Sequence, residues 1–164
     1  MDELELRPAR PEDHAAIIDL ARQTFAGICL ADQLHRQFGV PPYGDPSLAG
    51  EVGHGPAIAQ RLRAHPDRFW VSVLNGRVVG YVSYGMDAQR GVGTIHSNGV
   101  AHDARGRGVG TAQVRRMVAL FREHGMKHAA VATGLSPGFA PARRMYEKAG
   151  FQPVARNVRY FMPL

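Results

Sequence analysis

The segment from Arg68 to Gly85 constrains the fold more than any other part of the sequence. Two runs, RFWVSVL and RVVGYVSYG, are rich in β-branched and aromatic residues and flank the dipeptide Asn75-Gly76. Asn-Gly is the preferred pair for a two-residue hairpin turn, because both central positions of that turn need a positive φ. The segment therefore predicts two adjacent antiparallel strands.

Patterns before this hairpin predict one strand and two helices. LELRPAR, residues 4–10, alternates apolar and polar side chains as a half-buried strand does. Helical spacing of apolar residues follows over 11–30 and, less regularly, over 54–67. The proline- and glycine-rich stretch at 37–50 predicts a loop between the two helices.

The run VGTIHSNGVA, residues 92–101, predicts a third central strand. Its Asn98-Gly99 pair could form a second tight turn, but that turn would leave only two residues as the partner strand. We therefore predict one strand with a glycine-marked bulge at Gly99.

The rest of the chain alternates helix and strand. An amphipathic helix follows residue 110 and ends at Gly125, which suits a C-terminal cap. Residues 127–135 predict a short buried strand, 136–150 a helix and 151–164 the final strands. Antiparallel strands followed by helical crossovers indicate a mixed central sheet flanked by helices, of class α/β (α+β type). The 164 residues suffice for a single domain over 1–164.

The net charge of +6 is distributed unevenly. Residues 1–60 hold nine acids and four arginines, whereas residues 61–164 hold five acids and sixteen basic residues. Such a chain can bind an anionic ligand with one part and attract a cationic ligand with the other. The arginines are not interleaved with aromatic residues and match no nucleic-acid-binding motif, so we expect no nucleic-acid partner.

Composition also sets expectations about the compartment. No apolar run approaches the length of a membrane span, and the acidic start MDELELRP lacks the apolar core of a signal peptide. The single cysteine, Cys29, excludes an intrachain disulfide and fits a reducing compartment. We expect a cytoplasmic protein without a membrane partner.

The segment RGRGVG, residues 105–110, leads directly into the amphipathic helix. Its glycines permit close backbone approach, and a helix N-terminus presents free N–H groups at the positive end of the helix dipole. Arg105 and Arg107 add charge, so the segment favours a phosphate ligand. It lacks the lysine of a Walker A loop, and a dinucleotide-binding pattern would need glycine at Thr111.

Residues 105–110 fit the pattern Q/R-x-x-G-x-G/A between a strand and a helix. Together with APARRMYEKAGF at residues 140–151 and the order of the elements, they resemble the GNAT superfamily of N-acetyltransferases. The resemblance implies a three-layer fold, acetyl-CoA as co-substrate and no metal. It also implies direct attack of an amine on the thioester in a ternary complex.

The resemblance assigns cofactor contacts to the strand and the loop. In the family, the loop amides hold the pyrophosphate, and the strand contacts the pantetheine arm where two parallel strands splay apart. The matching positions here are Val100, Ala101, His102, Arg105, Gly106, Arg107, Gly108, Val109, Gly110 and Thr111. The bulge predicted at Gly99 would start the splay. Many relatives have proline at His102, and many have an asparagine at Phe139 that contacts coenzyme A.

Three groups match roles in the family's chemistry. The backbone N–H around Val100 matches the oxyanion donor. Tyr146 matches the tyrosine that gives the leaving thiolate a proton or a hydrogen bond; its ordinary pKa of about 10 is close to that of a thiol. His96 stands where many relatives have a glutamate base, and imidazole accepts protons at neutral pH. The alternatives are a core tyrosine and an ordinary strand histidine.

The acceptor remains open from the sequence. In the family its cleft is formed largely by the first helices and their loop, which here carry Asp32, Asp45 and Glu51. These acids would attract a cationic amine, either a small molecule or a peptide. The alternative from another functional class is a regulatory module that binds acyl-CoA without catalysis. Family members often form homodimers, and nothing in the sequence locates an interface.

Overall fold

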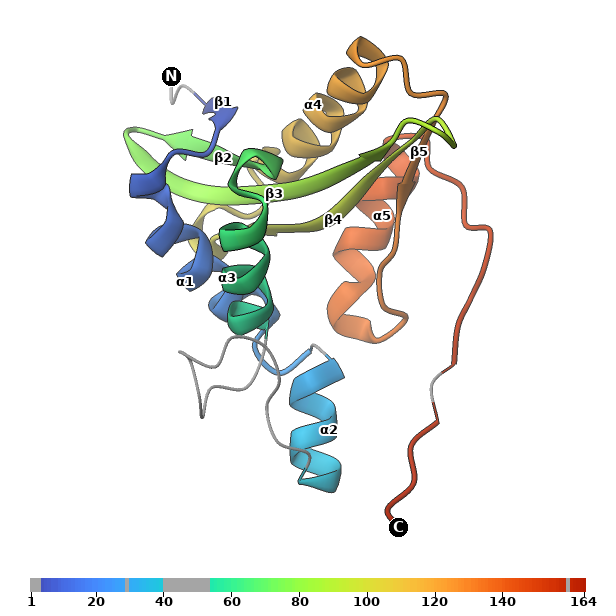
Figure 1. Cartoon of the computed structure of the whole chain (residues 1–164). Coiled ribbons are helices and arrows are strands. Elements are labelled where there is room, and N and C mark those ends of the chain that lie inside the picture. Colours follow the sequence, from blue (N-terminus) through green and yellow to red (C-terminus); the bar gives the residue numbers. More distant parts are fainter. Residues whose placement is uncertain (1–3, 29, 40–53, 159) are drawn as a thin grey trace.

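The computed structural model describes residues 4–28, 30–39, 54–158 and 160–164 (Figure 1). Its strands are β1 (Leu4–Pro8), β2 (Phe69–Leu74), β3 (Arg77–Asp87), β4 (Val92–Val100) and β5 (His128–Val131). Its α-helices are α1 (His14–Phe25), α2 (Leu30–Phe38), α3 (His54–Ala64), α4 (Val109–Glu123) and α5 (Ala140–Lys148). Short 3₁₀ turns are η1 (Pro11–Asp13), η3 (Pro66–Arg68), η4 (His102–Ala104) and η5 (Pro137–Phe139).

Within the described residues the five strands form one sheet in the order β1-β2-β3-β4-β5. β1 to β4 pair antiparallel, and β5 pairs parallel to β4. The predicted hairpin is confirmed: Asn75 and Gly76 have φ values of 50° and 76° between β2 and β3. The mixed central sheet expected from the sequence is therefore present.

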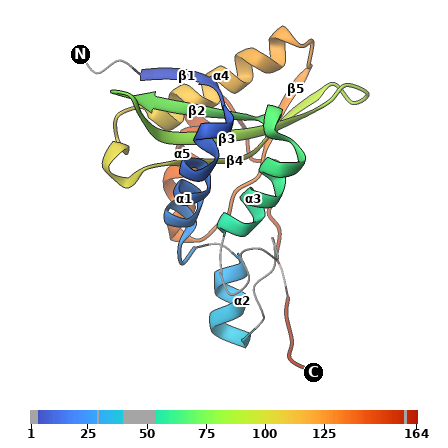
Figure 2. The ribbon, with the colours of Figure 1, turned by 60° about the vertical axis from the view of Figure 1, so that its left-hand side comes forward.

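Helices cover both faces of this sheet. Figures 1 and 2 show α1 and α3 on one face and α4 and α5 on the other. Ile17, Ile58 and Leu62 of α1 and α3 pack with the sheet in one core cluster. Met117 and Tyr146 of α4 and α5 belong to the second cluster. This three-layer arrangement confirms the predicted α/β class.

The first predicted helix is shorter than expected, and a further helix follows it. α1 ends at Phe25, and Gly27 then adopts a φ of 75°, which breaks the helical path. α2, which the sequence patterns did not predict, extends to Phe38 and so overlaps the loop expected at 37–50. Figures 1 and 2 show α2 away from the sheet. The remainder of that expected loop lies outside the described residues, apart from Gly39.

The bulge predicted at Gly99 is wrong in position. Ser83 of β3 faces Ser97 and Tyr84 faces Ile95, so the extra residue of β4 is His96. Gly99 pairs regularly with Tyr81. A Cβ on Gly99 would lie 2.8 Å from the Tyr81 ring, so close side-chain approach explains this glycine.

Two predictions for the end of the chain are also wrong. β5 is not buried: His128 and Ala129 are exposed, and the other two residues are half-buried. The described residues of 151–164 form no strand. Pro153 and Pro163 cannot donate to a ladder. Phe161 instead places its ring 4.9 Å from that of Phe38 in α2.

The start of α1 is fastened to β1 by a partly buried ion pair. The Arg7 guanidinium donates hydrogen bonds of 2.6 and 3.0 Å to the two carboxylate oxygens of Asp13. The backbone N–H of Arg10 donates a further bond of 2.8 Å to the same carboxylate. Asp13 is only 4% exposed, and the hydrogen bond from Arg7 holds its pKa below the ordinary value. The pair thus fixes the path of α1 over the sheet.

We expect Asp13→Asn to lower the free energy of unfolding at pH 7 by about 3 kcal/mol, because it leaves a partly buried guanidinium without its charge partner. The pKa of Asp13 is lowered in the fold, so its stabilisation is complete above the unfolded pKa of about 3.9 and is lost as pH falls through the folded value. Urea unfolding at pH 7, 5 and 2 measures this. Asp19→Asn, at an exposed pair with Arg22, is the control. An equal loss at every pH would contradict the account.

Candidate functional site

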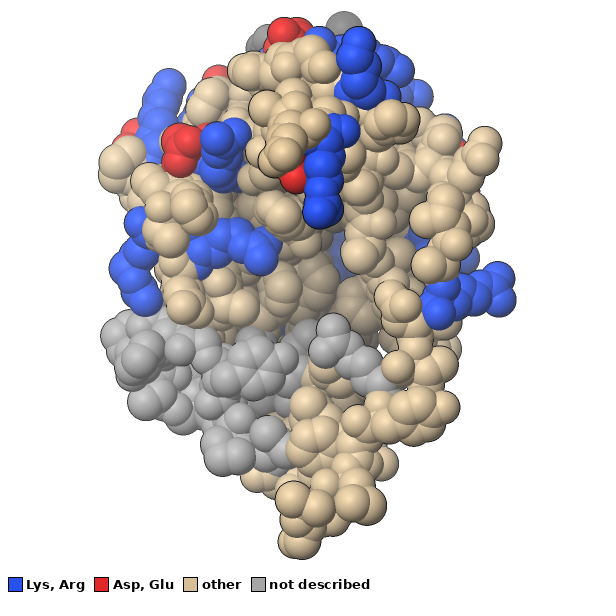
Figure 3. All heavy atoms as spheres, turned by 45° about the vertical axis from the view of Figure 1, so that its right-hand side comes forward, with Lys and Arg blue, Asp and Glu red and all other residues tan. Residues whose placement is uncertain are grey.

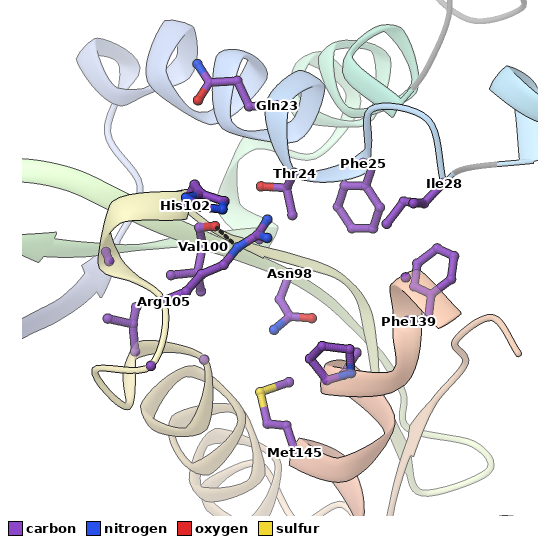
Figure 4. A pocket seen from close by; sticks show the side chains of 18 of the residues that line it. Gln23, Thr24, Phe25, Ile28, Asn98, Val100, His102, Arg105, Phe139 and Met145 are labelled. Carbon is purple, nitrogen blue, oxygen red and sulfur yellow. Dashed lines mark hydrogen bonds between the residues drawn. The ribbon is translucent and has the colours of Figure 1, made fainter. Parts of the chain in front are cut away.

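A cavity of about 660 Å³ lies where four elements meet: the end of α1, the free end of β4, the start of α4 and the start of α5 (Figure 4). Its lining residues are Gln23, Thr24, Phe25, Ala26, Ile28, Asn98, Gly99, Val100, His102, Ala104, Arg105, Gly106, Gly108, Val109, Gly110, Thr111, Gly138, Phe139, Pro141, Ala142 and Met145. The walls are glycine-rich and basic at the loop and apolar where α1 approaches α5. The cavity can therefore hold a ligand with an anionic part and an uncharged part.

The cavity exists because β5 leaves β4 early. β4 and β5 pair from Val92 to Ile95, and β4 continues to Val100 without β5. The splay therefore begins at the His96 bulge and not at Gly99. The N–H of Ala101 donates 2.8 Å to the carbonyl of Val79 in β3. Since backbone groups alternate in direction along a strand, those of Val100 turn toward the gap.

The glycine-rich loop closes one end of the cavity. Gly106 and Gly108 have φ values of 76° and 81°, which only glycine adopts without strain. Gly108 is the N-cap of α4, and the first helical hydrogen bond runs from Ala112 N–H to Gly108 C=O at 2.9 Å. The N–H groups of residues 109–111 precede that bond and stand at the positive end of the helix. This geometry suits a phosphate group.

Most of the predicted cofactor positions line the cavity. Those that do are Val100, His102, Arg105, Gly106, Gly108, Val109, Gly110 and Thr111. Ala101 is buried in the core at 6% exposure, and Arg107 is outside the lining. The Arg105 side chain donates a bond of 3.3 Å from Nε to the Val100 carbonyl. The loop and the strand end are thereby joined at the cavity wall.

Tyr146 is buried beside the cavity rather than in its lining. It is 7% exposed, and its ring lies edge-on to Phe151 at 5.9 Å. Its hydroxyl donates a bond of 2.7 Å to Oδ1 of Asn98, which does line the cavity. Burial raises the pKa of Tyr146 to about 12. The phenol therefore stays protonated and can act as a donor over the whole working range of pH.

Asn98 belongs to a hydrogen-bond chain that sequence patterns missed. Its Nδ2 donates 3.3 Å to Oε1 of Gln113, and Nε2 of Gln113 donates 3.0 Å to Ser72 Oγ and 3.3 Å to the Gly99 carbonyl. Gln113 is fully buried. The available signal is a glutamine beside Val114 at the start of the apolar stripe of α4, and the Asn98-Gly99 pair by itself indicates only a turn or a bulge.

His96 lies on the other face of β4 from Tyr146. A Cβ on Gly85 would lie 2.6 Å from Nε2 of His96. Gly85 follows Tyr84, whose side chain packs with α4 and α5, so Gly85 and His96 face α1 and α3. His96 is exposed, and partial burial and the charge of Arg61 lower its pKa from the ordinary value. It is therefore neutral at physiological pH.

A second histidine lies on the same face and was not singled out from the sequence. His54 Nε2 lies 3.0 Å from Ser97 Oγ, which is 2.9 Å from the Tyr81 hydroxyl. Burial and the charge of Arg61 lower the pKa of His54 to about 4. Its ring also lies 4.2 Å from that of Phe25 in the cavity wall. This network holds α3 and α1 against β4.

The sequence resemblance predicts the acceptor cleft at the first helices and their loop, with Asp32, Asp45 and Glu51. Asp45 and Glu51 lie outside the described residues, and the Asp32 side chain is likewise not described. Figure 4 shows Phe25, Ile28 and Phe139 side by side at one end of the cavity. Nearby, Thr24 Oγ1 is buried without a hydrogen-bond partner among the described residues. On the face drawn in Figure 3, Lys and Arg side chains predominate over Asp and Glu around a central hollow.

The described part of the chain contains no cluster of three or more His, Cys, Asp or Glu side chains suited to a metal ion. None of its helices combines the length and the apolar character that crossing a bilayer requires.

Comparison with known proteins gives a consistent family. The model of the Acetyltransferase (GNAT) family matches residues 31–151. An acetyltransferase of Pectobacterium atrosepticum is 32% identical over 114 residues, which cover 70% of this chain and 64% of that protein. The chain spans less than two thirds of the length of the curated relatives that it matches.

Solved structures show the same fold. Ard1 from Thermoplasma volcanium superposes with a TM-score of 0.65 at 23% identity, over 93% of this chain and 84% of that one. A GNAT family acetyltransferase from Brucella melitensis, in complex with acetyl-CoA, superposes with a TM-score of 0.62 at 19% identity, over 92% and 84%. At these identities the likeness concerns the fold alone.

We expect Gly108→Ala to weaken binding of coenzyme A by about 5- to 30-fold, because a Cβ at this left-handed position costs about 1–2 kcal/mol and displaces the first amides of α4. Isothermal titration measures the affinity. Gly125→Ala is the matched control: it has a φ of 73°, lies just beyond the other end of α4 and has equally open surroundings. Gly125→Ala should lose a similar amount of stability but keep the wild-type affinity for coenzyme A. Equal affinity in all three proteins would remove the loop from the binding site.

Proposed function

This chain belongs to the GNAT family of acetyltransferases, and on that premise we propose that it transfers the acetyl group of acetyl-CoA to a primary amine. The attack is direct, within a ternary complex, and residues 1–164 act as one catalytic domain. One observation carries the proposal: the splayed end of β4 and the amide-rich start of α4 line the same cavity. An extended thioester cofactor with a pyrophosphate needs both.

The cofactor is proposed to lie with its pyrophosphate on the loop and its pantetheine arm along β4. The amides of residues 109–111 and the charge of Arg105 would hold the phosphates. The outward-facing carbonyl of Val100 would accept from an amide N–H of the pantetheine arm, and the Val100 N–H is the candidate oxyanion donor. Ala101 supports this strand from within the core, and His102 lines the cavity beside it.

The proposed reaction uses side chains on both faces of β4. The amine nitrogen attacks the thioester carbonyl carbon and forms a tetrahedral intermediate. His96 takes the proton that nitrogen must lose, directly or through a water molecule. The C–S bond then breaks, its electron pair goes to sulfur, and the products are the amide and the coenzyme A thiolate, with the amine's proton left on His96. The position of His96 at the start of the splay supports its role as the base.

Tyr146 is proposed to serve the leaving sulfur as a hydrogen-bond donor. Burial raises its pKa to about 12, whereas a free thiol titrates near about 8.5. Full transfer of the phenolic proton would therefore be uphill by about 5 kcal/mol. A donated hydrogen bond stabilises the developing thiolate without that cost. In the absence of substrate this donor is directed at Asn98.

The first experiment is thiol release from acetyl-CoA, followed spectroscopically against polyamines, amino acids, aminoglycosides and short peptides. Saturable release with one class of amine, together with mass-spectrometric detection of the acetylated product, is expected. Tight acetyl-CoA binding without transfer to any amine would instead favour the regulatory module. A protein that does not bind acetyl-CoA would overturn the proposal at its root.

Tyr146→Phe should lower kcat at least about tenfold, since it removes the donor to the thiolate and keeps the ring that packs in the core. The affinity for acetyl-CoA should change less than about twofold, because the phenol is not in the cavity lining. Steady-state kinetics and titration calorimetry separate the two effects. Tyr160→Phe, at a ring that is 92% exposed, is the control. Unchanged kcat would leave Tyr146 as a core residue only.

His96→Gln should lower kcat/KM and remove the acid limb from the pH profile of kcat/KM. The pKa of His96 is lowered, so in the wild type the limb should fall below pH 6.5, as imidazole gains its proton. An acceptor amine of high pKa is used, so that its own pKa lies outside this window. The slope of log kcat/KM against pH is then analysed below pH 7. His128→Gln, at an exposed histidine of β5, is the control. Superimposable profiles would dismiss His96 as the base.

A further inference from the structure

The hydrogen-bond chain beside Tyr146 has a direction that one backbone group determines. The Gly99 carbonyl can only accept, so the atom of Gln113 that faces it at 3.3 Å must be the amide nitrogen Nε2. The carbonyl oxygen of Gln113 then faces Asn98 and accepts from its Nδ2. The remaining atom of that amide, Oδ1, accepts from Tyr146. The side-chain amide of Asn98 is therefore held in one of its two orientations.

This orientation leaves one N–H of Asn98 for a ligand. An amide nitrogen carries two hydrogens, and Gln113 takes one of them. Asn98 is half-buried and lines the cavity, and Figure 4 shows its side chain extending from β4 toward the space between the loop and α5. The Tyr146 proton is meanwhile engaged by Asn98 Oδ1. In the absence of a ligand, the donor that faces the cavity is therefore an amide N–H, and the phenol is engaged behind it.

The surroundings of Gln113 are shaped for it. Its side chain is fully buried and joins three elements, since it contacts Ser72 of β2, β4 through Gly99 and Asn98, and its own helix α4. A Cβ on Gly80 of β3 would lie 2.5 Å from its Nε2, so glycine there leaves room for the amide. Burying a polar side chain is costly unless it is fully bonded, and here each polar atom has a partner.

We infer that Gln113 is a positioning residue, and that it orients the Asn98 amide so that its free N–H meets the thioester sulfur of the bound cofactor as a second donor beside Tyr146. The inference rests on the proposed function for the identity of that cofactor. As the C–S bond breaks and its electron pair goes to sulfur, the N–H donates to the forming thiolate and no proton is transferred. Tyr146, which donates to Oδ1 until charge develops on the sulfur, polarises the amide and strengthens this second donor.

Two variants of one residue separate positioning from structural support. Gln113→Met and Gln113→Glu both lose the amide nitrogen that donates to Ser72 and Gly99, but Gln113→Glu keeps an oxygen to accept from Asn98. Positioning predicts that kcat falls about tenfold in Gln113→Met and much less in Gln113→Glu, with acetyl-CoA affinity kept in both. Equal losses in both would assign Gln113 a purely structural role. Gln60→Met, at an exposed position of α3, is the control.

A second readout does not depend on turnover. In the complex with coenzyme A, the pKa of the bound thiol is measured from the ultraviolet absorbance of its thiolate. Asn98→Leu and Gln113→Met should raise this pKa by about one unit relative to the wild type, while Gln113→Glu and Gln60→Met should not. If coenzyme A binds and the thiol pKa is the same in all variants, the inference is wrong. If the pKa differs as expected but no amine is acetylated, the inference stands and the proposed function fails.

Discussion

The early end of the β4–β5 pairing is the constraint on which the site depends. Beyond Ile95 the backbone of β4 pairs, among the described residues, with β3 alone, and buried backbone groups must find partners elsewhere. The Arg105 side chain covers the Val100 carbonyl, and the N–H groups at the start of α4 lie beside the same gap. A ligand with both amide and phosphate groups would complete these bonds, which explains why loop and strand end act together.

α4 connects this gap with the rest of the core. Its first turn carries the amides of the loop, and one turn later Gln113 reaches into the sheet and bonds to Ser72 and Gly99. Gly110 packs against α5, since a Cβ at this position would lie 2.8 Å from the Met145 sulfur. The position of the phosphate site is therefore tied to the position of Asn98 and of α5. A shift of the helix would disturb both ends of a bound cofactor together.

Local signals predicted the fold well, and long-range packing decided what they missed. Asn75-Gly76 encodes its turn in two residues, and the glycines of the loop encode theirs, so both were found from the sequence. The His96 bulge was not, because it depends on the register of two strands and the glycine signal pointed to Gly99. The predicted C-terminal strands are absent from the described residues of 151–164 although β5 leaves one edge of the sheet unpaired, so a strand-forming composition did not by itself decide the pairing.

The residues of the candidate site likewise fall into those that local motifs predict and those that only long-range contacts reveal. Loop residues and Tyr146 follow motifs, so they could be named in advance, whereas Gln113 and Asn98 belong to no motif and acquire meaning only from their mutual contacts. The cavity wall formed by Thr24, Phe25 and Ile28 could not be predicted, because a helical pattern does not determine the path of α1 over the sheet.

The environments on the two faces of β4 shift the pKa values of His96 and Tyr146 in opposite directions. Partial burial and Arg61 lower the pKa of His96, and burial raises that of Tyr146 to about 12. Over the whole interval between them the base is neutral and the phenol is protonated, so neither limits the reaction near pH 7. The acceptor amine, in contrast, must lose a proton before it can attack. An amine with a pKa of about 10.4 is almost entirely protonated at that pH. Selection among amines would then depend on how readily each loses its proton in the cleft, and the positive charge of Arg61 close to His96 favours that loss.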